Sequence, residues 1–256
     1  MALPRGRMVS MSPSRRLVVD LMHFSLKVPC VTMERRMNLA RLVEARQACS
    51  PRPSWTALFI KASALVASKV PEMRQSFMPL PWPHFYEHDK NIATIPVERQ
   101  WGDEKVVLLA RVRSPENRSL GQIDAILSGY KDGPMEKIRS FRRDLRVAML
   151  PGPIRRLLMW ATLYLIGRQR SHNFGTFSVA SVAAHGAGML HIVPFLTSTL
   201  HYGLLDDKGC LDMRLTIDHR VLDGAAAARV LVALESVLAN EILDEVQSLR
   251  FVRKAA

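Results

Sequence analysis

The sequence is poor in cysteine, and its cysteines form no pattern. Three of its 256 residues are of this type: Cys30, Cys49 and Cys210. An odd number of widely spaced cysteines without a CxxC pair argues against a disulfide framework and against a zinc site. The eight histidines have no metal-ligand spacing either; they include His185, His191 and His201. We therefore expect reduced thiols in a cytoplasmic protein without a metal.

The sequence also lacks an apolar segment long enough to cross a membrane. The run at residues 157–166 has ten residues, whereas a spanning helix needs about 20. Residues 1–11 are basic but contain neither the apolar core nor the cleavage site of a secretory signal, so we expect a flexible basic arm there. Because 48% of all residues are hydrophobic, the remaining chain can bury a sizeable core.

Acidic residues are scarce relative to basic ones. The 36 Lys and Arg exceed the 23 Asp and Glu, and the resulting net charge of +13 favours polyanionic or phosphorylated partners. The sequence has no recognisable nucleic-acid module and no element that interleaves basic with aromatic residues. We therefore expect no nucleic-acid partner.

Residues 130–170 form a basic and apolar segment. Arginines flank its apolar run on both sides: Arg155, Arg156, Arg168 and Arg170. A helix of this kind suits burial in the core or in a subunit contact, and it also suits an anionic membrane surface. We favour burial, and a membrane-surface partner is the alternative.

Apolar periodicity, capping residues and breakers predict an α/β chain. A capping serine followed by proline starts a helix at residues 12–24, and a second strong helix occupies residues 54–69. Further helices are expected at 37–48, at 119–127 and from Gly224 onward. Strands are expected at 28–35, 90–97, 105–112, within FGTFSVASV and at 213–219.

The stretch RLTIDHRVLDGAAAARVLVALESVL places a histidine between a strand and a helix. In the extended segment MRLTIDH, His219 shares one face with three apolar residues: Met213, Leu215 and Ile217. A rigidly held, partly desolvated imidazole that stays neutral near pH 7 meets the requirements of a general base. A structural histidine satisfied by a neighbour is the alternative. Asp223 could orient this site, pair with an arginine or cap the helix, and Gly224 lets that helix begin close behind the strand.

The run DHRVLDGA, with a strand before it and a helix after it, resembles the H-x-x-x-D-G active-site signature of the chloramphenicol acetyltransferase-like superfamily. It is most similar to the catalytic core of the dihydrolipoyl acyltransferases of 2-oxo acid dehydrogenase complexes. Other blocks follow the order of that family: SPSRRLVVDLMHFSLKVPCVTMERRMNL, then SWTALFIKASALVASKVPEMRQSF, then FGTFSVASV. The resemblance covers roughly residues 9–240.

The resemblance implies a mixed β-sheet flanked by helices, in a chain that forms a homotrimer or a multiple of trimers. The active site would lie at the subunit boundary, with coenzyme A or acyl-CoA as substrate. His219 would remove the proton from a thiol or hydroxyl, which then attacks the thioester carbonyl. Asp223 would form an ion pair with Arg16 of the first helix and so keep the histidine loop in shape.

The sequence departs from the family in two places. The oxyanion donor of the family is a Ser or Thr at the fourth position of a motif such as FTIS, and the matching residues 177–180 end in alanine. Ser178, Ser181, a backbone N–H or water would have to replace that donor. A lipoyl domain and a Pro/Ala-rich linker do not precede the core. We therefore expect no lipoyl group on this chain and a separate lipoyl- or acyl-carrier protein as a partner.

The leading hypothesis is an acyltransferase catalytic domain at residues 12–245, with an insertion at 130–170 and a C-terminal tail at 246–256. It would move an acyl group between coenzyme A and a dihydrolipoyl thiol or another thiol, hydroxyl or amine. The rival hypothesis is a catalytically weak or inactive trimeric scaffold of the same fold.

Overall fold

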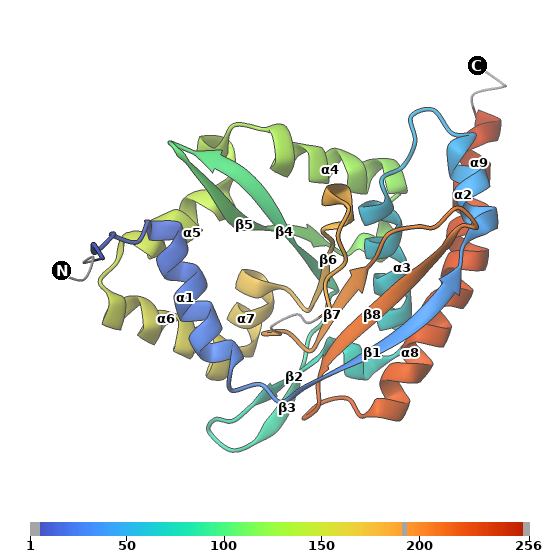
Figure 1. Cartoon of the computed structure of the whole chain (residues 1–256). Coiled ribbons are helices and arrows are strands. Elements are labelled where there is room, and N and C mark those ends of the chain that lie inside the picture. The colour runs from blue at the N-terminus through green and yellow to red at the C-terminus, as the bar shows by residue number, and fades with distance from the viewer. Residues whose placement is uncertain (1–5, 191–193, 253–256) are drawn as a thin grey trace, which may run out of the picture.

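Six strands form a mixed β-sheet in the computed structural model, which describes residues 6–190 and 194–252 (Figure 1). The strands lie across the sheet in the order β1-β8-β7-β6-β4-β5. Their bounds are Cys30–Asn38 for β1, Ile92–Trp101 for β4, Glu104–Arg113 for β5, Phe177–Ala180 for β6, Ser198–Tyr202 for β7 and Cys210–Asp218 for β8. β6 is parallel to β4 and β7, and the other pairs are antiparallel. The predicted mixed sheet flanked by helices is confirmed.

The helices begin where the sequence supplies caps. Ser12 caps α1 and Ser54 caps α3, each by accepting a backbone N–H in the first turn. The helices are α1 (Pro13–Ser25), α2 (Ala40–Gln47), α3 (Trp55–Lys69), α4 (Leu120–Asp132), α5 (Arg139–Met149), α6 (Gly152–Tyr164), α7 (Gly167–Phe174), α8 (Gly224–Val237) and α9 (Leu243–Val252). A small second sheet contains β2 (Gln75–Met78) and β3 (His84–Glu87).

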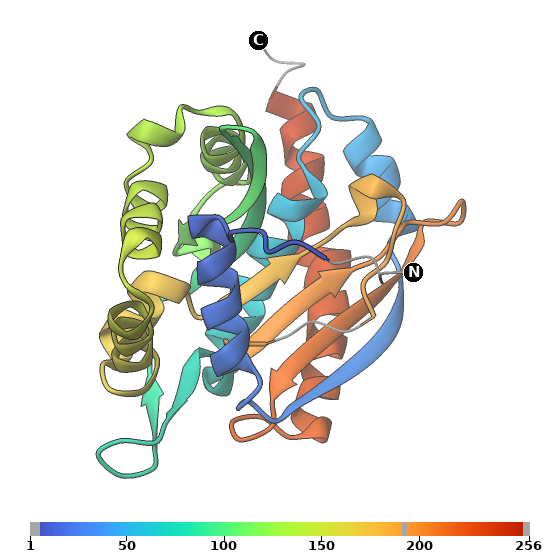
Figure 2. The ribbon, with the colours of Figure 1, turned by 60° about the vertical axis from the view of Figure 1, so that its left-hand side comes forward.

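The large sheet has one apolar face and one polar face, because side chains alternate along each strand. The apolar face packs against α3 and α8, which lie behind the sheet in Figure 2. On the opposite face a row of polar side chains crosses the strands in register: Thr32, Thr216, Thr199, Ser178, Thr94 and Arg111. All of these except Thr32 are buried. The alternation predicted for β8 is therefore confirmed up to Asp218.

The basic segment 130–170 contains α5, α6 and the start of α7, and these helices lie on the same side of the sheet as α1 (Figure 1). α6 packs against α1 through three buried side chains: Phe24, Met159 and Leu163. The buried carboxylate of Asp20, on α1, accepts from the guanidinium groups of Arg155 and Arg156. Two arginines of the segment thus hold α6 to α1.

The outer side of α6 is exposed and apolar. It carries Ile154, Leu157 and Leu158, and Leu165 follows at the end of the helix. The expected burial of this helix therefore holds for its inner side only, and a subunit contact through the outer side stays a prediction. Among residues 6–190 and 194–252, none of the helices has the length and apolar character that crossing a membrane requires.

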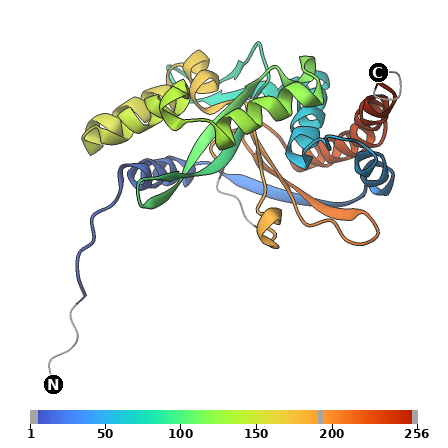
Figure 3. The same cartoon turned by 90° about the horizontal axis from the view of Figure 1, so that it is seen from above.

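The two ends of the chain differ. Residues 6–12 contain neither helix nor strand and run away from the sheet before α1 (Figure 3). Residues 246–252, which we expected to begin a tail, belong to α9, and Val246 is buried against the core. The folded part of the chain therefore continues to residue 252.

Candidate active site

His219 lies in the turn that connects β8 to α8. Its backbone N–H donates to the carbonyl of Pro29 at 2.9 Å, and the N–H groups of Val221 and Leu222 donate to the carbonyl of Asp218 at 3.0 and 3.1 Å. The strand ends at Asp218, one residue before the histidine, and His219 is not part of the buried apolar cluster that Met213, Leu215 and Ile217 join. The imidazole is exposed in the single chain. A partly desolvated imidazole therefore stays a prediction.

A buried carboxylate fixes this turn. Asp218 is 1% exposed, and its Oδ1 accepts from the backbone N–H of Arg220 at 3.0 Å and from Nε of the same arginine at 2.9 Å. Its Oδ2 accepts from Nη2 at 2.7 Å. The Arg220 guanidinium also lies 4.6 Å from the ring centroid of Phe77. Because Arg220 directly follows His219, the ion pair fixes the backbone that carries the imidazole.

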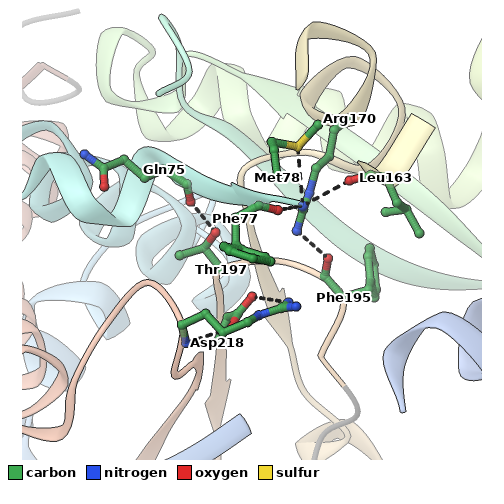
Figure 4. Close-up of polar contacts among 9 residues, drawn as sticks. Gln75, Phe77, Met78, Leu163, Arg170, Phe195, Thr197 and Asp218 are labelled. Carbon is green, nitrogen blue, oxygen red and sulfur yellow. Dashed lines mark hydrogen bonds and ion pairs between the residues drawn. The ribbon is translucent and has the colours of Figure 1, made fainter. Parts of the chain in front are cut away.

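Arg170 is a second cation close to Asp218, and unlike Arg220 it is buried. Figure 4 shows its guanidinium between three backbone carbonyls, with Asp218 on the side of the turn. It donates to Phe77 at 2.9 Å, to Leu163 at 3.2 Å and to Phe195 at 3.3 Å. Burial lowers the pKa of Arg170 to about 10, and the charge of Asp218 opposes that shift. Arg170 therefore stays protonated at neutral pH. The negative charge of Asp218 is then the charge that compensates both Arg170 and Arg220.

The predicted ion pair between Asp223 and Arg16 is not formed within the described chain. Asp223 caps α8, because its Oδ1 accepts a hydrogen bond of 2.6 Å from a backbone N–H in the first turn. The Arg16 guanidinium donates to the carbonyl of Met11 at 3.1 Å. Each side chain thus binds backbone near its own position. Gly224 fits its expected role, since an added Cβ there would lie 2.9 Å from Cε of Met33.

Ser178 and Ser181 direct their hydroxyls at backbone carbonyls. The buried hydroxyl of Ser178 donates to Thr94 at 3.0 Å. The hydroxyl of Ser181 donates to Tyr202 at 2.9 Å and accepts a nearby backbone N–H at 3.1 Å. Ala180 lies between them, is 7% exposed and has no hydroxyl. Each serine hydroxyl is therefore already occupied as a donor in the single chain.

His219 lies beyond the end of β8, whereas Ala180, at the end of β6, is level with the middle of β8. Ala180 pairs with His201, and His201 pairs with Arg214 of β8. His219 is five positions beyond Arg214, and a strand rises about 3.3 Å per residue, so it lies about 17 Å farther along. The structure therefore does not bring His219 and Ala180 together within one chain. Ser178 is level with Thr216 and so lies about 10 Å from His219 along the sheet.

The other histidines named from the sequence do not form a site together. His201 is buried, its Nε2 accepts from the N–H of Met189 at 3.3 Å, and burial together with Arg214 lowers its pKa. His185 is exposed, and His191 lies outside the described residues. In the part of the chain that the structure describes, no group of three or more His, Cys, Asp or Glu side chains is arranged to hold a metal ion.

Comparisons with known proteins find likeness in structure but not in sequence. No family model matches the chain, and no curated protein matches it. Many solved structures match the chain, and those that cover nearly all of it include the following three. The first is a dihydrolipoamide acetyltransferase of Azotobacter vinelandii, investigated for the role of a serine, a histidine and an asparagine in its catalytic mechanism. It has a TM-score of 0.66 and 21% identity, with 93% of this chain and 94% of that chain covered.

The second structure is a probable dihydrolipoamide acetyltransferase from Listeria monocytogenes 4b F2365, with a TM-score of 0.65, 17% identity and coverage of 93% and 95%. The third is a truncated catalytic core of the 2-oxoacid dehydrogenase multienzyme complex from Thermoplasma acidophilum, with a TM-score of 0.64, 17% identity and coverage of 92% and 99%. The chain therefore has the fold of these catalytic cores.

Sequence reasoning does not connect Asp218, Arg220 or Arg170 with the structure of the His219 turn. The tripeptide Asp-His-Arg contains the one local signal, since residues i and i+2 around a turn can form an ion pair. Arg170 gives no such signal, because its three carbonyl partners come from distant parts of the chain.

Proposed function

We propose that this chain is an acyltransferase that moves an acyl group between coenzyme A and a second nucleophile, with His219 as the general base. The observation that carries this proposal is an exposed imidazole on a turn fixed by the ion pair of the buried Asp218 with the partly buried Arg220, in an acetyltransferase fold. The histidine and the asparagine named for the Azotobacter vinelandii protein are four positions apart. His219 and Asp223 have the same spacing, which supports the assignment.

The neutral imidazole accepts the proton of the incoming thiol, hydroxyl or amine, and the nucleophile attacks the thioester carbonyl. The tetrahedral oxyanion then collapses, the bond to sulfur breaks, and the imidazolium returns the proton to the thiolate of coenzyme A. The fixed turn holds the ring in one place throughout. A dihydrolipoyl group on a separate carrier protein is one acceptor of the required chemistry.

A second copy of the chain completes the site. One chain presents His219 and the end of β6 about 17 Å apart along the sheet, so a substrate held at His219 meets the β6 end of a neighbour. We place the active site at each subunit boundary of a homotrimer. Light scattering should then give a mass of about three chains of 28.8 kDa, and a monomer would contradict the shared site.

The weakly active or inactive scaffold is the second candidate, and one observation favours it. Ala180 lacks a hydroxyl, and the hydroxyls of Ser178 and Ser181 are donated to carbonyls. Loss of one oxyanion donor typically lowers turnover by ~10²–10³. The same observation therefore fits either a slow enzyme or a scaffold, and only an activity measurement separates them.

The deciding experiment follows thiol release from a panel of acyl-CoAs, with and without dihydrolipoamide. We expect His219→Ala to abolish release while the variant stays folded and assembled. His84→Ala is the matched control, because His84 lies in β3 of the small second sheet and its ring binds the carbonyl of Trp82. An unchanged rate in His219→Ala would end the proposal, and no release by the wild type with any donor would favour the scaffold.

Ala180→Ser tests the oxyanion position separately. If a hydroxyl there faces the reacting carbonyl of a neighbour, turnover should rise by up to about 10². Ser178→Ala should leave turnover nearly unchanged, because that hydroxyl binds the carbonyl of Thr94 at 3.0 Å. A strong loss in Ser178→Ala would instead make Ser178 the donor.

A further inference from the structure

A large open concavity lies beyond the edge strand β5, away from the His219 turn. It has a volume of about 710 Å³ and is formed by β5, α4, α7 and the start of α5. Six of its lining side chains are basic: Arg111, Arg113, Arg118, Arg139, Arg143 and His172. No acidic side chain is among the described residues that line it. We name this concavity the arginine pocket.

The charges of the arginine pocket are poorly compensated. Asp144 is the carboxylate that contacts them, at 3.3 Å from Arg111 and 3.0 Å from Arg143. Arg118 donates to the backbone carbonyl of Arg113 at 2.8 Å, which removes no charge. Arg139 is exposed and forms no ion pair within the described chain. One carboxylate therefore faces five guanidinium groups.

The start of α5 adds further unused donors. No side chain caps this helix of 11 residues, its first turn has no acidic residue, and its first residues line the pocket. A helix N-terminus presents free N–H groups and a partial positive charge of about half a unit. In addition, Ser140 Oγ and Arg111 Nε are buried without a partner in the described chain. The Arg111 side chain is only 6% exposed. Such unsatisfied groups are costly unless a ligand binds them.

We propose that the arginine pocket binds a phosphate-bearing small molecule, with its phosphate at the N-terminus of α5 and its organic part against Ile126, Tyr130 and Ile138. Guanidinium forks and helix N-termini are the groups that recognise phosphate oxygens. The volume suits an organic ligand rather than a bare ion. Binding at this site does not depend on acyl transfer, so it can be tested independently of the function proposed above.

His172 offers a built-in reporter for this site. Its Nδ1 accepts from Arg113 Nη2 at 3.1 Å, so the ring is neutral and carries its proton on Nε2. Burial and then four arginines, Arg113 first, lower the pKa of His172. A bound phosphate would offset those positive charges and raise that pKa toward its ordinary value.

The test is calorimetric titration of the full chain with inorganic pyrophosphate at about 0.15 M salt, where exposed charges are largely screened beyond about 8 Å. Arg139→Gln should weaken binding by about tenfold to a hundredfold, as expected for a lost hydrogen bond to a charged group. Arg146→Gln is the matched control, since it removes the same charge from an exposed position in the last turn of the same helix. It should leave the affinity nearly unchanged.

The His172 ring signals, followed by nuclear magnetic resonance through a pH titration, should report a higher pKa when pyrophosphate is present. Absence of binding, equal weakening in both arginine variants, or an unmoved His172 would each overturn the proposal. Coenzyme A and pantetheine, which lacks the phosphates, are then added as competitors. If coenzyme A displaces pyrophosphate and pantetheine does not, the pocket binds the phosphates of coenzyme A. If neither compound displaces pyrophosphate, the pocket binds a different phosphate ligand.

Discussion

Asp218→Asn removes the negative charge that compensates two cations near the His219 turn. Asp218 is 1% exposed, pairs with Arg220 through both oxygens and opposes the desolvation of the buried Arg170. Breaking a buried ion pair on one side costs roughly 3–5 kcal/mol. Asparagine keeps one acceptor oxygen for the backbone N–H of Arg220, so we expect the lower end, about 3 kcal/mol. For a chain of this size that corresponds to a fall of roughly 6–12 °C in Tm.

Urea denaturation followed by circular dichroism measures this loss. Asp212→Asn is the matched control on the same strand, because the Asp212 side chain is 40% exposed and pairs with Arg36 at 3.4 Å. Exposed pairs of this kind contribute about 0.2–1 kcal/mol. Equal losses of stability in the two variants would refute the view that a buried charge fixes the turn.

Three further outcomes follow from single residues. Burial, aided by Arg170, lowers the pKa of His88 from 6.5 to about 4. As the pH is lowered, the unfolded chain therefore binds the proton before the folded chain does. The free energy of unfolding should fall by up to about 3 kcal/mol as the pH is lowered from 6.5 to 4, and urea denaturation of His88→Gln should lack this part of the pH dependence. Asp223→Ala should lower the free energy of unfolding by about 1 kcal/mol, because it removes the cap of α8. Asp223→Asn should keep both the stability and the acyl transfer, and a folded but inactive Asp223→Asn would indicate a role for the charge itself. Ser54→Ala should lower the thermal stability by roughly 1–2 kcal/mol, because Ser54 caps α3 and also binds the Asp124 carboxylate; a change below 0.3 kcal/mol would count against the cap.

Elements with strong local signals could be predicted from the sequence. Ser12 followed by Pro13 marks the start of α1, and Ser54 marks the start of α3, because a cap acts within one turn. The alternation of β8 gave its two faces, since strand geometry fixes a period of two. Gly224 was correctly placed at the first turn of α8.

The environment of the site could not be predicted, because it depends on where strands end and on contacts between distant residues. The strand β8 ends at Asp218, so His219 begins the turn instead of ending the strand as predicted. The cap formed by Asp223 was among the alternatives, but the partner of Arg16 could not be told from spacing alone. The arginine pocket joins β5, α4, α5 and α7, and no local pattern places those four together.

The separation of His219 from the end of β6 has a consequence for mixed populations. A variant damaged at His219 keeps the end of β6 intact, and a variant damaged at the end of β6 keeps His219 intact. Two such variants, each inactive alone, can be unfolded together and allowed to reassociate. Some subunit boundaries then combine an intact His219 turn from one variant with an intact end of β6 from the other. Activity would then reappear in the mixture, which a catalytic centre contained within a single polypeptide never permits.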